Sequence, residues 1–283
     1  MIDARALLRE SNLSPKKSFG QNFLVAEHVV RAIAEACVPA AELGQARVLE
    51  LGAGLGALTS ELVVRAKHVT AVERDRELVP ILARAMHASV DGGKLAILEA
   101  DAQSVDVGAI LGDQDAASAR VLCGNLPYQI TGRLLQLAVG ARAKVDRVVF
   151  MVQDEVAARL VADPGTKEYG ALTVFVRAAF DVTRVCKVSR GAFHPRPDVT
   201  SSVVRLSPAR PVRAEETSSF RALVKAAFGT RRKTLRNAWS GVAPADVIAR
   251  VANASGITLD ARGETLSVDD FARAAAALDA QRG

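Results

Sequence analysis

Cysteine, aromatic residues and long apolar runs are all scarce in this chain of 283 residues. No stretch approaches the roughly 18 consecutive apolar residues of a membrane-spanning helix, and the N-terminus has no apolar run long enough for a signal peptide. The three cysteines, Cys37, Cys123 and Cys186, form no Cys-x-x-Cys pair, which argues against a disulfide framework and a zinc site. We therefore expect a cytoplasmic protein without membrane contact and without a bound metal.

The rest of the composition is that of an ordinary folded protein. Hydrophobic residues make up 49% of the chain and charged residues 24%, which is enough to bury a full core. The net charge of +6 is compatible with a nucleic-acid partner but does not require one. Its distribution is more informative, because four basic residues fall in one short segment: Arg231, Arg232, Lys233 and Arg236.

Short apolar runs alternate with helical periodicity in the first half of the chain. The strand candidates are 46–51, 69–74, 95–100, 120–124 and 146–153. Helices are expected at 26–37, 58–66, 76–88 and 131–142. This alternation is typical of βαβ units and a parallel sheet, and the β-branched segments 181–189 and 200–208 are expected to close its edge.

The segment 207–216, with two prolines and mixed charge, is the best linker candidate. The pattern after it is helical, at 217–228, 231–240, 244–254 and 267–281. Ser267 and Asp270 predict a capping box at the start of the last helix. We expect a doubly wound, Rossmann-like α/β domain over residues 1–206 and a small all-helical domain over 207–283.

The stretch LELGAGLGALT places Gly52, Gly54 and Gly56 directly after the first strand. In open α/β sheets a cofactor binds in this crevice, and glycine lets the backbone approach it closely. The spacing Gly-x-Gly-x-Gly is one residue short of the dinucleotide fingerprint. By itself, such a turn is equally consistent with a tight strand–helix connection.

Acidic residues stand at the ends of the next two strands. Glu73 ends the second strand, 21 residues after Gly52, where a carboxylate can accept both ribose hydroxyls. Asp101 follows the third strand, where it can accept a hydrogen bond from an adenine amino group. Either acid alone would be a solvated strand end. Together with the glycine turn they favour an adenosine ligand without a pyrophosphate, which fits S-adenosylmethionine.

The fourth strand leads into CGNLPYQIT, where Asn125, Leu126, Pro127 and Tyr128 carry no charge. Pro127 holds Leu126 extended, so the Asn125 side-chain oxygen and the Leu126 carbonyl can accept both hydrogens of an exocyclic amine. Tyr128 offers a face on which a base can stack. The methyl donor is already a cationic sulfonium. Methyl transfer therefore depends on the alignment of the attacking amine more than on a charged base that removes a proton. The alternative is an ordinary turn with Tyr128 in the core.

Two further stretches are candidates for this site. KKSFGQNFL (16–24) has little helix or strand pattern and is interpreted as a functional loop, or else as the lead-in to the helix at 26–37. In AFHPRPDVTSSVV (192–204), Phe193 precedes two prolines that stiffen the loop and could cover the second face of a base. His194 is expected to be a loop or phosphate contact, because no second ligand stands at metal-binding spacing.

With these motifs in order, the sequence resembles the rRNA adenine N6-dimethyltransferases, and among them the bacterial small-subunit class. The matching stretches, between about residues 16 and 239, are FGQNFL, LELGAGLGALT, VERD, EADA, GNLPYQIT, FHPRPDVTSSVVRL and AAFGTRRKTLRNAW. The resemblance implies a class I methyltransferase fold and S-adenosylmethionine as cofactor. It implies a cofactor site of Asn22, Leu24, Gly52, Glu73, Asp101 and Asn125. It also implies an adenine site of Asn125, Leu126, Pro127 and Tyr128, covered by Phe193.

The resemblance further implies a substrate and a partner. Members of the family transfer two methyl groups to N6 of each of two adjacent adenosines near the 3′ end of 16S rRNA, in the assembling small ribosomal subunit. A monomer is expected, with Arg231, Arg232, Lys233 and Arg236 contacting rRNA phosphates. Thr230 replaces the usual glutamine, and 129–132 is not the commonest set; both departures are expected to affect RNA docking or the shape of the pocket rather than the reaction.

Three alternatives stay open on the sequence. A large-subunit rRNA methyltransferase of the macrolide-resistance type shares the cofactor motifs, although RRKTLRN favours the small-subunit class. A non-catalytic assembly factor could keep the fold as a scaffold, although Glu73, Asp101 and an intact NLPY argue against lost catalysis. A nicotinamide dehydrogenase is disfavoured by the glycine spacing.

Overall fold

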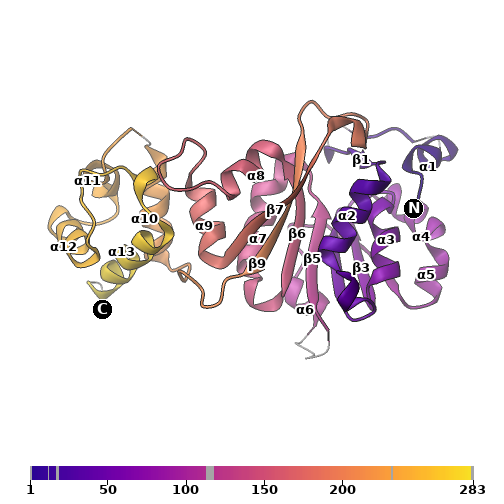
Figure 1. The fold of residues 1–283 in the computed structure, drawn as a ribbon, viewed down its shortest axis with the longest axis horizontal. Helices are drawn as coiled ribbons and strands as arrows, with labels where there is room; N and C mark the ends of the chain where they lie inside the picture. The colour runs from indigo at the N-terminus through magenta and orange to yellow at the C-terminus, as the bar shows by residue number, and fades with distance from the viewer. Residues whose placement is uncertain (1, 12, 17–18, 113–117, 231, 282–283) are drawn as a thin grey trace. The chain divides into compact units, whose positions relative to one another are not determined.

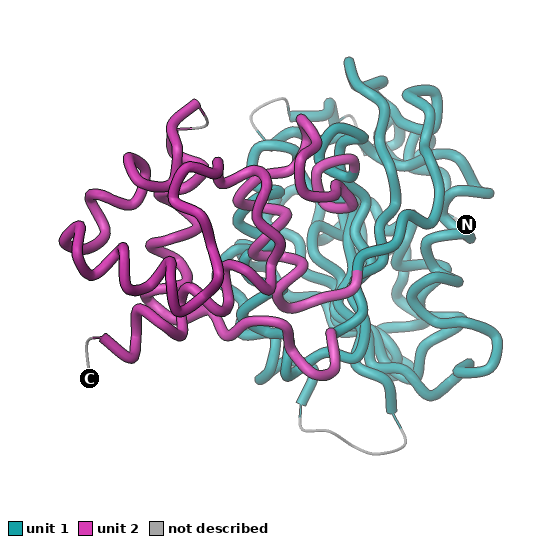
Figure 2. Tube along the Cα trace, turned by 60° about the vertical axis from the view of Figure 1, so that its left-hand side comes forward, with its two compact units in different colours: residues 1–157, 182–208 teal, residues 158–181, 209–283 magenta. Residues whose placement is uncertain are grey.

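The chain forms two compact units in the computed structural model, which describes residues 2–11, 13–16, 19–112, 118–230 and 232–281. The first unit comprises residues 1–157 and 182–208, and the second comprises 158–181 and 209–283 (Figure 2). The predicted boundary at 206/207 lies beside the last crossing between the units, whereas 158–181 packs within the second unit instead of the first. The two functional domains themselves stay a prediction.

The first unit is built on a sheet of seven strands in the order β4-β3-β2-β5-β6-β9-β7 (Figure 1). These strands are β2 (Arg47–Leu51), β3 (His68–Glu73), β4 (Leu95–Glu99), β5 (Arg120–Asn125), β6 (Arg147–Gln153), β7 (Phe180–Val188) and β9 (Ser201–Pro208). Strands β2 to β6 pair in parallel with one another, and β9 is antiparallel to β6. The predicted doubly wound sheet with two closing strands is confirmed.

The strand order reverses between β2 and β5, which pair in parallel with Glu50 opposite Cys123. Ligands of open α/β sheets bind outside the carboxyl ends of the strands at such a reversal. Gly124 permits this approach, because a Cβ atom there would lie 2.4 Å from the carbonyl oxygen of Leu51. The two chemically richest stretches of the sequence, after Leu51 and after Gly124, therefore emerge side by side.

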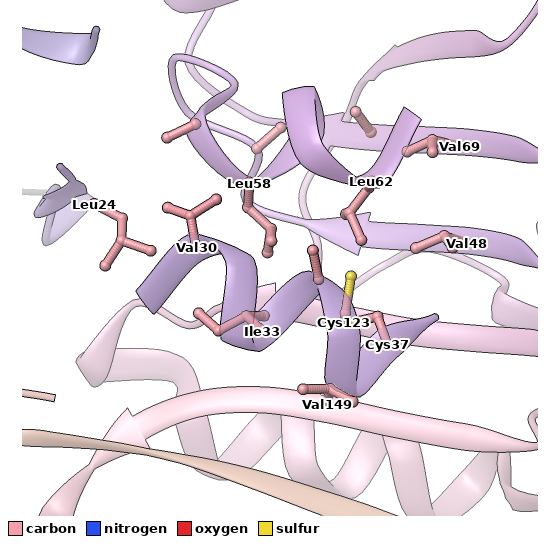
Figure 3. Packing of buried hydrophobic residues seen from close by; sticks show 14 of the residues in the cluster. Leu24, Val30, Ile33, Cys37, Val48, Leu58, Leu62, Val69, Cys123 and Val149 are labelled. Atoms are coloured by element: carbon pink, nitrogen blue, oxygen red, sulfur yellow. The ribbon is translucent and has the colours of Figure 1, made fainter. Parts of the chain in front are cut away.

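Helices α2 (Glu27–Cys37) and α3 (Ala57–Arg65) cover one face of this sheet. Val48, Cys123 and Val149 of the strands pack with Ile33 of α2 and Leu62 of α3 (Figure 3). Alternate positions on the opposite face are buried as well: Leu49, Leu51, Leu122 and Val148. Burial on both faces explains why the strands are nearly continuous apolar runs. The other helices before residue 161 are α1 (Ala4–Glu10), α4 (Leu78–Ala85), α5 (His87–Asp91), α6 (Val107–Leu111), α7 (Thr131–Gly140) and α8 (Asp154–Leu160).

A small second sheet joins the two stretches that were interpreted as loops. Strand β1 (Phe23–Leu24) pairs antiparallel with β8 (Phe193–His194), with Phe23 opposite His194 and Leu24 opposite Phe193. The pairing brings together segments from near the start and from the last third of the chain. Both stretches therefore contain a short strand, which was not predicted.

The second unit is helical, with α9 (Ala171–Ala179), α10 (Ser218–Gly229), α11 (Leu235–Ala238), α12 (Ala245–Ser255) and α13 (Val268–Ala280). The capping box at Ser267 and Asp270 is confirmed. The helix predicted over 231–240 begins only at Leu235, because Thr234 is extended and occupies the N-cap position. Helix α9 was not predicted. No helix among the described residues is long and apolar enough to span a bilayer.

Tyr169 connects the two chain segments of the second unit. Its ring is buried, and its hydroxyl donates a hydrogen bond of 2.8 Å to the carbonyl oxygen of Leu266. This environment raises the pKa of the phenol to about 12, mainly through burial. The segment 158–181 is thus attached to the helical unit by a satisfied buried hydroxyl.

Replacing Tyr169 with Phe should lower the free energy of unfolding of this unit by about 1–2 kcal/mol, because the Leu266 carbonyl loses a buried partner. Urea denaturation followed by the fluorescence of Trp239, the sole tryptophan and part of the buried core of this unit, measures the change. Thr166→Ala, which removes an exposed local hydroxyl bond nearby, is the control. Equal midpoints for the two variants would contradict the proposed link.

Candidate active site

A cavity of about 180 Å³ opens where β2, β3 and β5 end. Its walls contain every residue predicted for the cofactor: Asn22, Leu24, Gly52, Glu73, Asp101 and Asn125. They also contain Leu126, Pro127 and Tyr128 of the predicted adenine site. The structure thus brings these residues together, although they come from five separate stretches of sequence.

Glu73 holds the glycine turn after β2. Its Oε2 accepts the N–H of Gly54 at 2.8 Å, and its Oε1 accepts the N–H of Asp75 at 2.8 Å. Gly54 has a φ of +57°, and a Cβ atom there would lie 3.2 Å from the ring of Phe23. Burial raises the pKa of Glu73 although these N–H groups favour its charged form. Each carboxylate oxygen keeps a lone pair for a ligand hydroxyl.

Glu50 is a cavity residue that the sequence motifs did not single out. It shares the helix-covered face of β2 with Val48, is 2% exposed, and accepts a hydrogen bond of 2.6 Å from the Thr59 hydroxyl of α3. Burial raises the pKa of Glu50 to about 7. An acid at a core position of a buried strand was the available signal, because such a position is normally apolar.

The Asn125 amide is oriented by the backbone of the N-terminal loop. Its Nδ2 donates a hydrogen bond of 3.0 Å to the carbonyl oxygen of Asn22, so its Oδ1 is the atom left to accept a ligand hydrogen. The Leu126 side chain is buried and its N–H donates to Met151 of β6 at 3.1 Å. Pro127, with φ −58° and ψ +130°, turns the chain into a short 3₁₀ helix, Tyr128–Ile130.

The tyrosine that follows is anchored at its hydroxyl. Tyr128 Oη lies 2.9 Å from Ser201 Oγ at the start of β9. Burial raises the pKa of the Tyr128 phenol, and the serine hydrogen bond offsets part of that effect. The ring is half-buried and borders the cavity, so the alternative in which it is simply a core residue does not describe it.

The loop that contains Asn22 is tied to Asp75, another residue that the motifs did not single out. Lys16 Nζ lies 2.7 Å from Asp75 Oδ1, and Gln21 Nε2 donates to Asp75 Oδ2 at 2.8 Å. Burial would raise the pKa of Asp75, but the bonds from Lys16 and Gln21 outweigh it and the pKa lies below its usual range. Phe19 lines the cavity on this loop.

Asp101 follows β4 and lines the cavity. Its Oδ1 accepts the N–H of Gln103 at 2.9 Å, and its Oδ2 lies 3.3 Å from Arg74 Nη1. The guanidinium of Arg74 in turn stands 5.3 Å from the centre of the Phe19 ring. The carboxylate is thus held at the cavity wall by partners on both of its oxygens.

Phe193 and the predicted rRNA-contacting residues that the structure describes do not line the cavity. Phe193 is 2% exposed and packs in the core of the first unit, so its role over a base stays a prediction. Arg232 and Lys233 are exposed in the turn before α11, and Arg236 on that helix is 3.2 Å from Asp260. Arg231 lies outside the described residues. No group of three potential metal ligands is found within the described ranges.

The geometry of this site can be compared with known proteins. The family model described as ribosomal RNA adenine dimethylase matches residues 12–280. Ribosomal RNA small subunit methyltransferase A of Pelotomaculum thermopropionicum is 42% identical over 280 residues, which cover 95% of this chain and 92% of the relative. The protein of the same name from Moorella thermoacetica is 43% identical, covering 94% and 93% of the two chains.

Solved structures agree on the fold. A dimethyladenosine transferase from Plasmodium falciparum superposes with a TM-score of 0.72 at 24% identity, covering 89% of this chain and 95% of that one. The 23S rRNA methyltransferase ErmE superposes with a TM-score of 0.65 at 25% identity, covering 91% and 100%. Together with the match over residues 12–280, this shows that the chain belongs to the ribosomal RNA adenine dimethylase family of S-adenosylmethionine-dependent methyltransferases.

Proposed function

We propose that this enzyme transfers two methyl groups to N6 of each of two adjacent adenosines near the 3′ end of 16S rRNA. We place the reaction in the cytoplasm, on the assembling small subunit, and assign it to a monomer. The observation that carries the proposal is the single cavity shared by the acids at the strand ends and the Asn125–Tyr128 turn. The names of its relatives support a small-subunit rRNA substrate.

The residues of the cavity fit S-adenosylmethionine, which supplies an electrophilic methyl group when bound. Gly52 and Gly54 leave the backbone open beside the ligand. The free lone pairs of Glu73 suit ribose hydroxyls, and Asp101 suits the adenine amino group. Glu50 adds negative charge to a cavity that has to hold a cationic ligand. This donor set is suited to a nucleoside with a positively charged tail.

The Asn125 turn aligns the attacking amine. Asn125 Oδ1 and the Leu126 carbonyl accept the two N–H groups of the target adenine, which draws the nitrogen lone pair out of the ring and toward the methyl group. S-adenosylmethionine held by Glu73 and Asp101 would supply the methyl group to the nitrogen that Asn125 and Leu126 align, and the methylated nitrogen would release its proton to water. The step needs positioning in a neutral site rather than a charged base.

The substrate adenine must leave its stack to reach this turn. Tyr128 provides the face on which it stacks, and we assign Phe193 to the other face. An unstacked adenine costs less in a hairpin loop than in a duplex, which favours a loop as the substrate. We assign Arg231, Arg232, Lys233 and Arg236 to phosphate contacts, which add affinity without reading the sequence.

Replacing Asn125 with Ala should reduce methyl transfer by about 100-fold or more, because one of two positioned acceptors is lost. Transfer of labelled methyl groups to undermethylated small ribosomal subunits measures the change, with large subunits alongside. Asn253→Ala, an exposed asparagine on α12, is the control and should match the wild type. Label in large-subunit rRNA, or no label on either subunit with tight subunit binding, would contradict the proposed function.

Replacing Glu50 with Gln should change the pH dependence of stability and of cofactor affinity. The folded-state pKa of about 7 lies above the unfolded value, so wild-type stability falls as pH rises from about 4.5 to about 7. Without cofactor, Glu50→Gln should therefore be more stable than the wild type at about pH 8, by about 1–3 kcal/mol. The difference should disappear below about pH 4.5.

Binding of S-adenosylmethionine should show the opposite effect. A cationic ligand favours the charged carboxylate, so wild-type affinity should rise between about pH 6 and pH 8, and Glu50→Gln should bind more weakly with less pH dependence. Urea unfolding and titration calorimetry measure the two quantities. The exposed Glu99→Gln is the matched control. Parallel pH curves for Glu50→Gln and the wild type would rule out this role.

A further inference from the structure

Helix α1 and strand β8 border a second hollow beside the cofactor cavity. It is lined by Arg5, Leu8, Arg9, Leu13, Ser14, Pro15 and His194. Arg5 and Arg9 are exposed, stand one helical turn apart, and have no acidic partner among the residues that the structure describes. None of these lining residues is acidic. The hollow is therefore a site of positive charge.

The hollow adjoins the active site through shared elements. On α1, Ala4 lines the cofactor cavity while the next residue, Arg5, lines the hollow. In the sheet formed by β1 and β8, Phe23 lines the cavity, and its strand partner His194 lines the hollow. Leu8 and Phe23 share one buried cluster, so α1 is packed against the wall of the active site.

An RNA strand needs cations close to its target nucleotide. The cavity itself is lined by Glu50, Glu73 and Asp101, and its arginine, Arg74, is paired with Asp101. These charges repel phosphate, so the backbone on either side of an inserted adenosine has to be neutralised outside the cavity. Arginine forks bind phosphate oxygens in pairs, and a histidine ring N–H can donate one further bond.

We propose that Arg5, Arg9 and His194 bind the phosphate backbone of the rRNA strand next to the adenosine that enters the cavity. The site rests on the proposed function, because it takes an rRNA adenosine as the occupant of the cavity. It assigns to α1 a part in binding RNA that is separate from the basic segment before α11. Its location beside β8 also gives His194 the phosphate-contact role that its loop suggested.

The test is the double variant Arg5→Gln/Arg9→Gln in the full-length chain. The matched control is Arg84→Gln/Lys94→Gln, which removes two exposed charges of the same unit, one of them directly before β4 and thus at the amino end of that strand. Binding to a synthetic RNA hairpin with two adjacent adenosines in its loop is measured without cofactor over a range of salt concentrations.

The double variant should bind the hairpin about tenfold more weakly, and the slope of log affinity against log salt should fall by about 1.4, the value for two phosphate contacts. Its affinity for S-adenosylmethionine should equal that of the control. A slope equal to that of the control would overturn the proposal, as would weakened binding of a poly-glutamate peptide with unchanged RNA binding. Failure of the wild type to methylate 16S rRNA would instead overturn the proposed function. The two outcomes are distinguishable because hairpin binding is measured without cofactor, separately from methyl transfer.

A different observation concerns the far wall of the adenine site. Ser201 is fully buried, and its hydroxyl oxygen is hydrogen-bonded to that of Tyr128 at 2.9 Å. The next residue, Ser202, donates to Asp154 Oδ1 at 2.6 Å, and Asp154 lies 3.4 Å from Arg184. The start of β9 is thus fixed on both sides, so Ser201 is a rigid partner for a ring that borders a cavity.

We infer that Ser201 is a positioning residue that holds the Tyr128 ring in the orientation on which the adenine stacks. Without this hydrogen bond the half-buried Tyr128 ring could change its orientation. Fixing the ring when the adenine binds would then cost entropy and weaken substrate binding. The inference rests on the proposed function of Tyr128. It predicts that Ser201 acts on the reaction only through the phenol.

Ser201→Ala should raise the KM for rRNA by about twofold to tenfold, the loss expected for one hydrogen bond. Tyr128→Phe should do the same, and the double variant should be no worse than either. Ser201→Thr should restore the wild-type KM, while Ser255→Ala, a buried serine of the second unit, should leave it unchanged. Multiplied effects in the double variant would overturn the inference.

A spectroscopic reading is independent of rRNA. In a Tyr169→Phe background, Tyr128 is the sole tyrosine, so ultraviolet titration reports the pKa of its phenol. Loss of the serine should raise this pKa further, because the bond favours the phenolate. An unchanged titration would overturn the inference even if the wild type proved inactive on 16S rRNA, which would overturn the proposed function alone.

Discussion

The close approach of β2 and β5 is the constraint on which the active site depends. These two strands are neighbours although β3 and β4 separate them in sequence, and only a residue without a side chain fits at Gly124 opposite the Leu51 carbonyl. Their carboxyl ends deliver the glycine turn and the Asn125 turn to one place. A cofactor and a base can then meet there without any moving part having to bring them together.

Charge is divided between the two halves of this site. The half proposed for the cofactor has Glu50, Glu73 and Asp101, whereas the turn from Asn125 to Tyr128 is neutral. Acids beside a cationic ligand favour its binding, whereas the neutral oxygens of Asn125 and Leu126 can accept the N–H groups of an amine without adding a further charge. The division therefore suits a cationic methyl donor on one side of the site and a neutral amine on the other.

Much of this could be predicted from local sequence, because a parallel sheet buries continuous apolar runs and ends each run at a cofactor-binding edge. Glu50 was missed because its meaning depends on burial, which neighbouring helices impose. The pairing of Phe23 with His194 was missed because two-residue strands have no period to detect. Helix α9 was missed although one of its faces packs in the core of the second unit. The late start of α11 was missed because the extended backbone at Thr234, which makes no side-chain capping bond, follows no local propensity signal.

The bond from Asn125 to the Asn22 carbonyl connects the turn proposed for the adenine with the loop beside the proposed cofactor site. Asn22 belongs to the loop that Lys16 and Gln21 tie to Asp75, and Asp75 in turn donates its N–H to Glu73. A ligand that ordered Glu73 would therefore act, through these bonds, on the loop whose backbone orients the Asn125 amide. Because coupling between sites is reciprocal, a cofactor that tightens this chain would improve the geometry for the adenine, and a bound adenine would improve cofactor binding by the same factor.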